Sequence, residues 1–115
     1  MTTFAQGEIY VRKLDQAPAE LVAFDEKNAR GEWIISHSES GHHHLLEADG
    51  VTVMERKANA PAGVQVLIAI VENPSRLYQD AGNAHEAHDL SSGIYEMRIA
   101  REYDPFTQQA RRVAD

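Results

Sequence analysis

The chain has 115 residues, of which 43% are hydrophobic and 25% are charged, a composition typical of a globular protein and not of a disordered or low-complexity chain. Eleven Lys and Arg against 18 Asp and Glu give a net charge of -7, which disfavours binding to nucleic acid or to anionic lipid. The chain has no cysteine, so disulfide frameworks and thiolate metal sites are excluded.

The length indicates one compact domain. We predict a single β domain over residues 1–104 and a C-terminal tail over residues 105–115, where the sequence becomes polar after an Asp-Pro step. The first ten residues lack the features of a signal peptide. The longest strongly apolar run, residues 64–71, is far shorter than the roughly 20 residues of a membrane helix. We therefore expect a cytoplasmic protein that contacts no membrane.

Seven segments rich in β-branched and aromatic residues alternate with turn-forming clusters, which predicts strands. They cover residues 8–14, 32–37, 42–48, 51–56, 64–71, 76–78 and 94–103. Residues 18–24 fit either a short helix or an irregular strand, and residues 25–31 are polar enough for an exposed loop. Strands without a long helix predict an all-β fold, either a small antiparallel barrel or a two-sheet sandwich.

Two of these segments and one turn carry more detailed predictions. Residues 64–71 are apolar on both faces, which predicts a central strand. Residues 94–103 alternate, so that Tyr95, Met97 and Ile99 face the core while Glu96, Arg98 and Glu102 face water. Residues 48–50 end in Asp-Gly, a hairpin signal between the strands on either side. The arginines at positions 98, 101, 111 and 112 are too sparse for a polyanion groove and are expected to be solvated or paired with carboxylates.

The chemically suggestive residues are histidines in two clusters, residues 42–44 and 85–88. Because the side-chain period of a strand is two, His42 and His44 share one face while His43 points to the other. Such a pair can hold one divalent ion at about 2.0–2.2 Å, and His85 and His88 have the spacing of one turn. We predict that His42, His44, His85 and His88 ligate a divalent metal: zinc, nickel, iron or manganese.

The remaining polar residues of the clusters have alternative roles. Glu47 and Glu86 are candidates for a metal ligand, for an orienting group or for the catalytic group that moves a proton, and the alternative is that they are surface acids. His43 is expected to be structural or exposed. His37 is expected on the same strand face as Trp33 and Ile35, at the edge of the core.

Two resemblances follow from these motifs. His42-x-His44, followed by Glu47 and Gly50, resembles a shortened first motif of the cupins, whose double-stranded β-helix holds a divalent metal with histidines and a glutamate. The Gly-His-x-His and His-x-x-His patterns, with residues 90–95 and 101–103, also resemble a group of small uncharacterised bacterial and phage-associated proteins. That second resemblance implies that both histidine pairs belong to one structural plan, and it implies no activity.

Two functions from different classes fit the sequence. In the first, a β domain binds a divalent metal and acts on a small-molecule ligand, with an open coordination position and a glutamate that moves a proton. In the second, the protein is a non-enzymatic accessory or phage-type structural protein whose histidines stabilise a loop or a subunit contact. A homodimer is expected under both, because small β domains have sheet edges that need covering.

Overall fold

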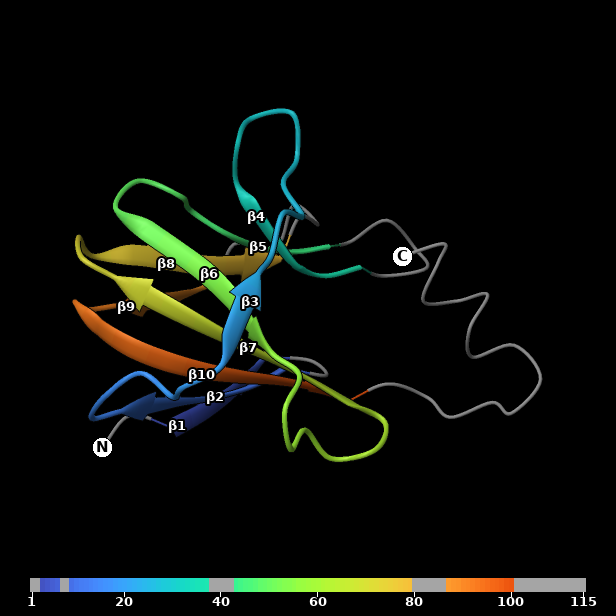
Figure 1. Cartoon of the computed structure of the whole chain (residues 1–115). Helices are drawn as coiled ribbons and strands as arrows, with labels where there is room; N and C mark the ends of the chain where they lie inside the picture. Colours follow the sequence, from blue (N-terminus) through green and yellow to red (C-terminus); the bar gives the residue numbers. More distant parts are fainter. Residues whose placement is uncertain (1–2, 7–8, 38–42, 80–86, 101–115) are drawn as a thin grey trace.

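The computed structural model describes residues 3–6, 9–37, 43–79 and 87–100, and they form two antiparallel sheets packed face to face (Figure 1). The larger sheet has the strand order β1 (Thr3–Gln6), β2 (Ile9–Leu14), β10 (Gly93–Ala100), β7 (Val64–Val71), β6 (Val51–Arg56) and β3 (Leu21–Ala23). The smaller sheet has the order β4 (Trp33–Ser36), β5 (His44–Leu46), β8 (Ser75–Gln79) and β9 (His88–Leu90). The prediction of an all-β, two-sheet sandwich is confirmed.

The hydrophobic core lies between the two sheets. The larger sheet contributes Ile9, Val11, Val51, Val53, Leu67, Ala69, Val71, Tyr95, Met97 and Ile99, and the smaller sheet contributes Trp33, Ile35, Leu46, Leu77 and Leu90. In each strand these residues alternate with residues of the opposite face, as the period of two requires. Two Trp33 neighbours illustrate the packing: its ring contacts Phe24, and its indole N–H donates to the carbonyl of Val51 in the other sheet at 3.1 Å.

All seven predicted strand segments contain a strand; residues 51–56 and 64–71 match the structure at both ends, and the described ends of the other segments differ by at most two residues. The prediction that residues 64–71 form a central strand is confirmed, since β7 lies between β10 and β6. Its neighbouring residues Leu67 and Val66 are both fully buried, Leu67 in the core and Val66 on the opposite face. Of the two forms considered for residues 18–24, the structure contains a strand, β3. The predicted tail, residues 105–115, lies outside the described residues.

The short strands β1 and β9 were not predicted, and neither was the exact position of β3. All three lie at sheet edges. An edge strand of three or four residues is defined mainly by the hydrogen bonds of its single neighbour, and it carries too few residues for a clear alternating pattern.

The hairpin predicted at residues 48–50 is wrong. The turn itself forms, with the Val51 N–H donating to the Ala48 carbonyl at 3.0 Å and Gly50 at a φ of 69°. However, β5 pairs with β4 and β8, whereas β6 pairs with β3 and β7. The Asp-Gly step therefore carries the chain from one sheet to the other, because the partner strands on either side, and not the turn, decide the pairing.

Two predictions about side-chain faces are also wrong. Glu96, expected in water, is only 2% exposed, because arginines on β2 and β10 enclose its carboxylate. His37 does not continue the face of Trp33 and Ile35, since a register shift in the pairing of β4 with β5 follows Ile34. After this β-bulge Ser36 is the buried partner of His44, and His37 turns to the opposite side.

Within the described ranges no helix is long and apolar enough to cross a membrane.

Candidate functional site

His44, the first residue of β5, points into the interior of the sandwich. It is 2% exposed, and its Nδ1 lies 2.8 Å from the side-chain oxygen of Gln6 on β1 of the other sheet. The amide nitrogen of Gln6 donates to the carbonyl of Leu77 at 3.2 Å, which leaves the amide oxygen to accept from His44. The imidazole therefore carries a proton on Nδ1.

His88, the first residue of β9, contacts the same edge strand. Its ring stacks on Phe4 of β1, with the ring centroids 4.2 Å apart and the planes inclined by 19°. Phe4 and Gln6 are two residues apart, so the points where β1 meets His88 and His44 are about 7 Å apart along the strand. The structure thus brings one histidine from each sequence cluster to one end of the sandwich, under β1.

The other two described histidines lie on the opposite side of the smaller sheet. The rings of His37 and His43 pack edge to face with centroids 5.0 Å apart, and Nε2 of His37 lies 3.3 Å from a carboxylate oxygen of Glu26. This placement agrees with the prediction that His43 points away from His44. Neither His37 nor His43 shares the interior with His44.

Of the two predicted carboxylates, the structure describes only Glu47, which lies at the surface. Glu47 follows the end of β5, three residues from His44, and its side chain is exposed. Its backbone joins β8: the amide donates to the Arg76 carbonyl at 3.2 Å, and its carbonyl accepts from the Ser75 hydroxyl at 2.8 Å. His42, His85 and Glu86 lie outside the described residues. Among the residues that are described, no three His, Asp or Glu side chains form a group that could hold a metal ion.

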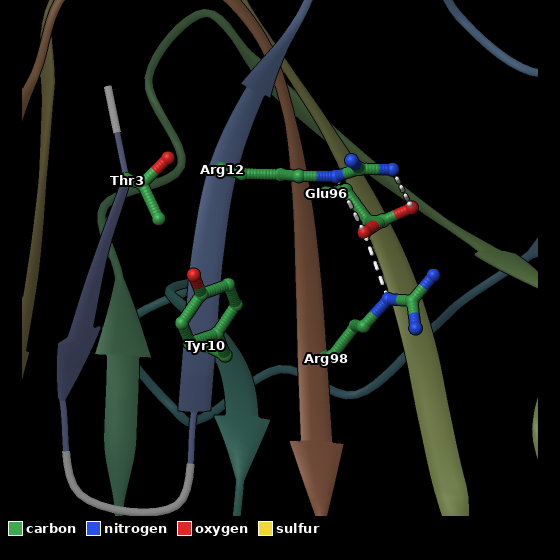
Figure 2. Close-up of a pocket in the computed structure, with 5 residues that line it drawn as sticks. All are labelled: Thr3, Tyr10, Arg12, Glu96 and Arg98. Carbon is green, nitrogen blue, oxygen red and sulfur yellow. Dashed lines mark hydrogen bonds and ion pairs between the residues drawn. The ribbon is translucent and has the colours of Figure 1, made fainter. Parts of the chain in front are cut away.

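A second polar arrangement occupies the outer face of the larger sheet, and the sequence did not reveal it (Figure 2). The carboxylate of Glu96 accepts hydrogen bonds from Arg12 at 3.0 Å through Nε and at 3.4 Å through Nη2, and from Nε of Arg98 at 2.9 Å. Glu96 and Arg12 are direct cross-strand partners of β10 and β2. The sequence had placed Glu96 and Arg98 on one face of a strand, but the pairing with Arg12 is remote in sequence and was not predicted.

The charge on Glu96 is fixed by its neighbours. Burial alone raises the pKa of this carboxyl, but the hydrogen bonds from Arg12 and Arg98, together with their positive charges, outweigh burial and hold the pKa below its ordinary value. Glu96 is therefore ionised at neutral pH, although its side chain is only 3% exposed. The two guanidinium groups are fixed in position by a carboxylate that sits beneath them.

A third polar cluster joins the smaller sheet to the loop before β4. Glu32 accepts from the hydroxyl of Tyr78 on β8, from Asn28 at 2.9 Å and from Arg30 at 2.8 Å. Burial raises the pKa of Glu32, yet these hydrogen bonds bring it below its ordinary value, while burial and the carboxylate raise the pKa of Tyr78. Every member of this cluster has a partner within the loop or on β8, which is the arrangement of a structural anchor.

The family model of a domain of unknown function, DUF8820, matches residues 5–100. The chain belongs to this family. The expectation of an uncharacterised family is thereby confirmed. No curated protein and no solved structure matches the chain significantly.

The DUF8820 match contains most of both polar regions. It begins at residue 5 and ends at residue 100, so it includes His44, His88 and Gln6 of the interior site. It also includes Arg12, Glu96 and Arg98 on the outer face. The two regions therefore belong to the domain that defines the family.

Proposed function

We propose that this domain binds a divalent metal ion at the end of the sandwich where β1 meets β5 and β9. His44 supplies the first ligand through Nε2, and His42, His85 and His88 are the further ligands. A histidine that binds metal through one ring nitrogen commonly donates its other N–H to a carbonyl or carboxylate, which fixes the tautomer and the ring orientation. The hydrogen bond from Nδ1 of His44 to Gln6 has this form, and it is the observation that carries the proposal.

The contacts of β1 support the use of ligands from both sequence clusters. Gln6 holds His44 and Phe4 stacks on His88, so both imidazoles are oriented by the same short strand. Imidazole nitrogens are suitable ligands for zinc, nickel and iron, and with carboxylates for manganese. If three protein ligands bind, the fourth position is available to water or to a small molecule, and Glu86 is the sequence neighbour that could move a proton there.

One observation favours a second function, in which the histidines have a structural role and hold no metal. The stacking of His88 on Phe4 and the burial of His44 each satisfy the side chain by contacts within the protein. This is the arrangement expected of an accessory or structural protein whose histidines join the two sheets.

Elemental analysis of protein purified without a histidine tag, followed by titration of the metal-free protein with Zn²⁺, Ni²⁺ and Mn²⁺, decides between these functions. We expect saturable binding of one ion per chain that weakens below about pH 6.5, where free imidazole becomes protonated. His44→Gln is expected to abolish this binding, whereas His43→Ala retains it. Circular dichroism of both variants shows whether each is folded.

Two results would overturn the proposal. One is an absence of saturable binding together with a melting temperature that chelator leaves unchanged, which supports the structural role. The other is binding that His43→Ala and His44→Gln weaken equally, since His43 lies on the side of the sheet that faces away from Gln6.

A further inference from the structure

The outer face of the larger sheet carries an excess of positive charge. The residues of this face alternate with the core residues of the same strands. On the described strands of the larger sheet, the ionisable groups of this face are Arg12, Glu96, Arg98, Arg56 and the phenol of Tyr10. Three arginines against one glutamate leave two positive charges unbalanced, on a chain whose net charge is -7.

Glu96 fixes two of these arginines without using most of their hydrogen-bond donors. A guanidinium has five N–H donors. Arg98 uses only Nε on Glu96, and Arg12 uses Nε and one Nη2 hydrogen. The side chains of Arg12 and Arg98 are 48% and 38% exposed, so their remaining donors are open to solvent. In Figure 2 the two side chains approach Glu96 from either side, from β2 and from β10.

Arg56 adds a third guanidinium to the same face. Val66 of β7 is the cross-strand partner of Arg56 on one side and of Arg98 on the other. Cross-strand partners share a face, and two strand spacings place these two arginine backbones about 10 Å apart. The Nε of Arg56 is buried and has no hydrogen-bond partner in the described part of the chain. A buried donor without an acceptor is uncommon in folded proteins and costs stability.

The arginines border a shallow hollow of about 460 Å³ lined by Thr3, Tyr10, Arg12, Glu96 and Arg98. Tyr10 is the cross-strand partner of Arg98, and its side chain is 50% exposed, unusually high for a tyrosine in the middle of a sheet. The hydroxyls of Thr3 and Tyr10 are hydrogen-bond donors at the rim of this hollow (Figure 2). Fixed guanidinium groups beside hydroxyl donors are the usual means by which proteins bind an oxyanion.

We propose that this hollow is a binding site for a small ligand that carries an oxyanion, a carboxylate or a phosphate group. The oxyanion accepts hydrogen bonds from the Nη groups of Arg98 and Arg12, and the Tyr10 ring lies beside the rest of the ligand. Glu96 acts as a positioning residue that holds both guanidinium groups in place before the ligand arrives. The site is separate from the described histidines, which lie in or next to the strands of the smaller sheet. It therefore does not rest on the proposed metal binding.

A purely structural role for these ion pairs explains the arrangement of the arginines less well than ligand binding does. One arginine is enough to balance the buried carboxylate, and it could do so with both its Nε and Nη groups. Here two arginines share Glu96, and a third lies across Val66 with its buried Nε unsatisfied. Arg12 and Arg98 therefore keep donors beside the hollow that are open to solvent and available to a ligand.

The test is a titration of the intact protein with inorganic phosphate and, separately, with succinate, at constant pH and constant ionic strength made up with sodium chloride. The Nε–H resonances of the arginines are followed by nuclear magnetic resonance. We expect saturable shifts at Arg12 and Arg98 with at least one of the two anions, and the tighter of them identifies the class of oxyanion. Shifts that stay linear, or that chloride alone reproduces, overturn the proposal.

Variants separate ligand binding from stability. Arg98→Gln is expected to weaken binding about tenfold or more, the usual effect of losing a charge-assisted hydrogen bond. Arg98→Lys keeps the charge and can still pair with Glu96, but it lacks the planar pair of Nη donors, so we expect a smaller loss. Arg76→Gln on β8, in the other sheet, is the matched control and should leave binding unchanged. Equal affinity in Arg98→Gln and the control, with both folded, overturns the proposal.

Discussion

His44 and Glu96 are both 2% exposed, yet the molecule satisfies these two buried polar side chains in opposite ways. His44 lies between the sheets and donates to the amide oxygen of Gln6, whose amide nitrogen donates to the carbonyl of Leu77. Glu96 lies on the outer face and is ionised, with two half-exposed arginines as partners. The interior site therefore depends on packing across the two sheets, whereas the outer site depends on charge, and the two should respond differently to mutation and to pH.

The largest effect is expected from His44→Ala. The substitution leaves a cavity between the sheets and removes the donor to the amide oxygen of Gln6, which together should lower the free energy of unfolding by about 3 kcal/mol. Urea denaturation with chelator present measures this without any contribution from bound metal. The control is His43→Ala, which should cost less than about 1 kcal/mol. Equal losses in the two variants would contradict the assignment of His44 to the interior.

A smaller effect is expected from Glu96→Gln. The amide keeps the shape of the side chain but removes its charge, so the hydrogen bonds from Arg12 and Arg98 weaken. Because both arginines are partly exposed and regain water, the expected loss at pH 7 is about 1–2 kcal/mol. Glu72→Gln, at an exposed position after β7, is the control and should change stability by less than about 0.5 kcal/mol. A loss no larger than this control would show that the arginines contribute no net stability.

The smallest effect is a difference in pH dependence. Hydrogen bonds and charge hold the pKa of Glu96 below the ordinary value of 4.5 in the folded protein. The unfolded chain therefore binds more protons in this acidic range, and folding stability is fully present above about pH 5 and falls as the pH drops through the folded pKa.

Unfolding curves between pH 6 and pH 3 measure this difference. The stability gap between the wild type and Glu96→Gln should narrow as the pH falls over this range. Glu32, whose pKa is also lowered, is present in both proteins, so both should retain some acid sensitivity. A gap between wild type and Glu96→Gln that stays constant with pH would mean that the charge of Glu96 is not what stabilises the outer site.

Strand length decided how much of the fold the sequence could predict. Long strands with clear alternation, such as β7 and β10, were found from pattern alone. The short edge strands were not, and β1 is the consequential omission, since its Phe4 and Gln6 contact His88 and His44. A four-residue strand with a mixed pattern is specified by its partner strand. The pattern of one segment carries no information about that partner.

The candidate sites, like the short strands, depend on partners that are distant in sequence. A period of two correctly assigned Tyr95 and Glu96 to opposite faces, but it did not indicate that the outer face would bury a carboxylate. That burial depends on Arg12, 84 residues away in sequence. Similarly, the single extra residue of the bulge in β4 reversed the face of His37, and no feature of the sequence marks it. The positions of His42, His85 and Glu86 stay predictions.

The order of strands in the larger sheet also affects how this protein is made. β10 is the last strand in the described part of the chain, and it lies between β2 and β7. Until β10 has left the ribosome, β1 and β2 lack the strand that joins them to the rest of the larger sheet. We therefore expect the sandwich to form only after β10 has been synthesised, with slow kinetics typical of distant β pairings. A chain truncated before β10 should be insoluble or rapidly degraded.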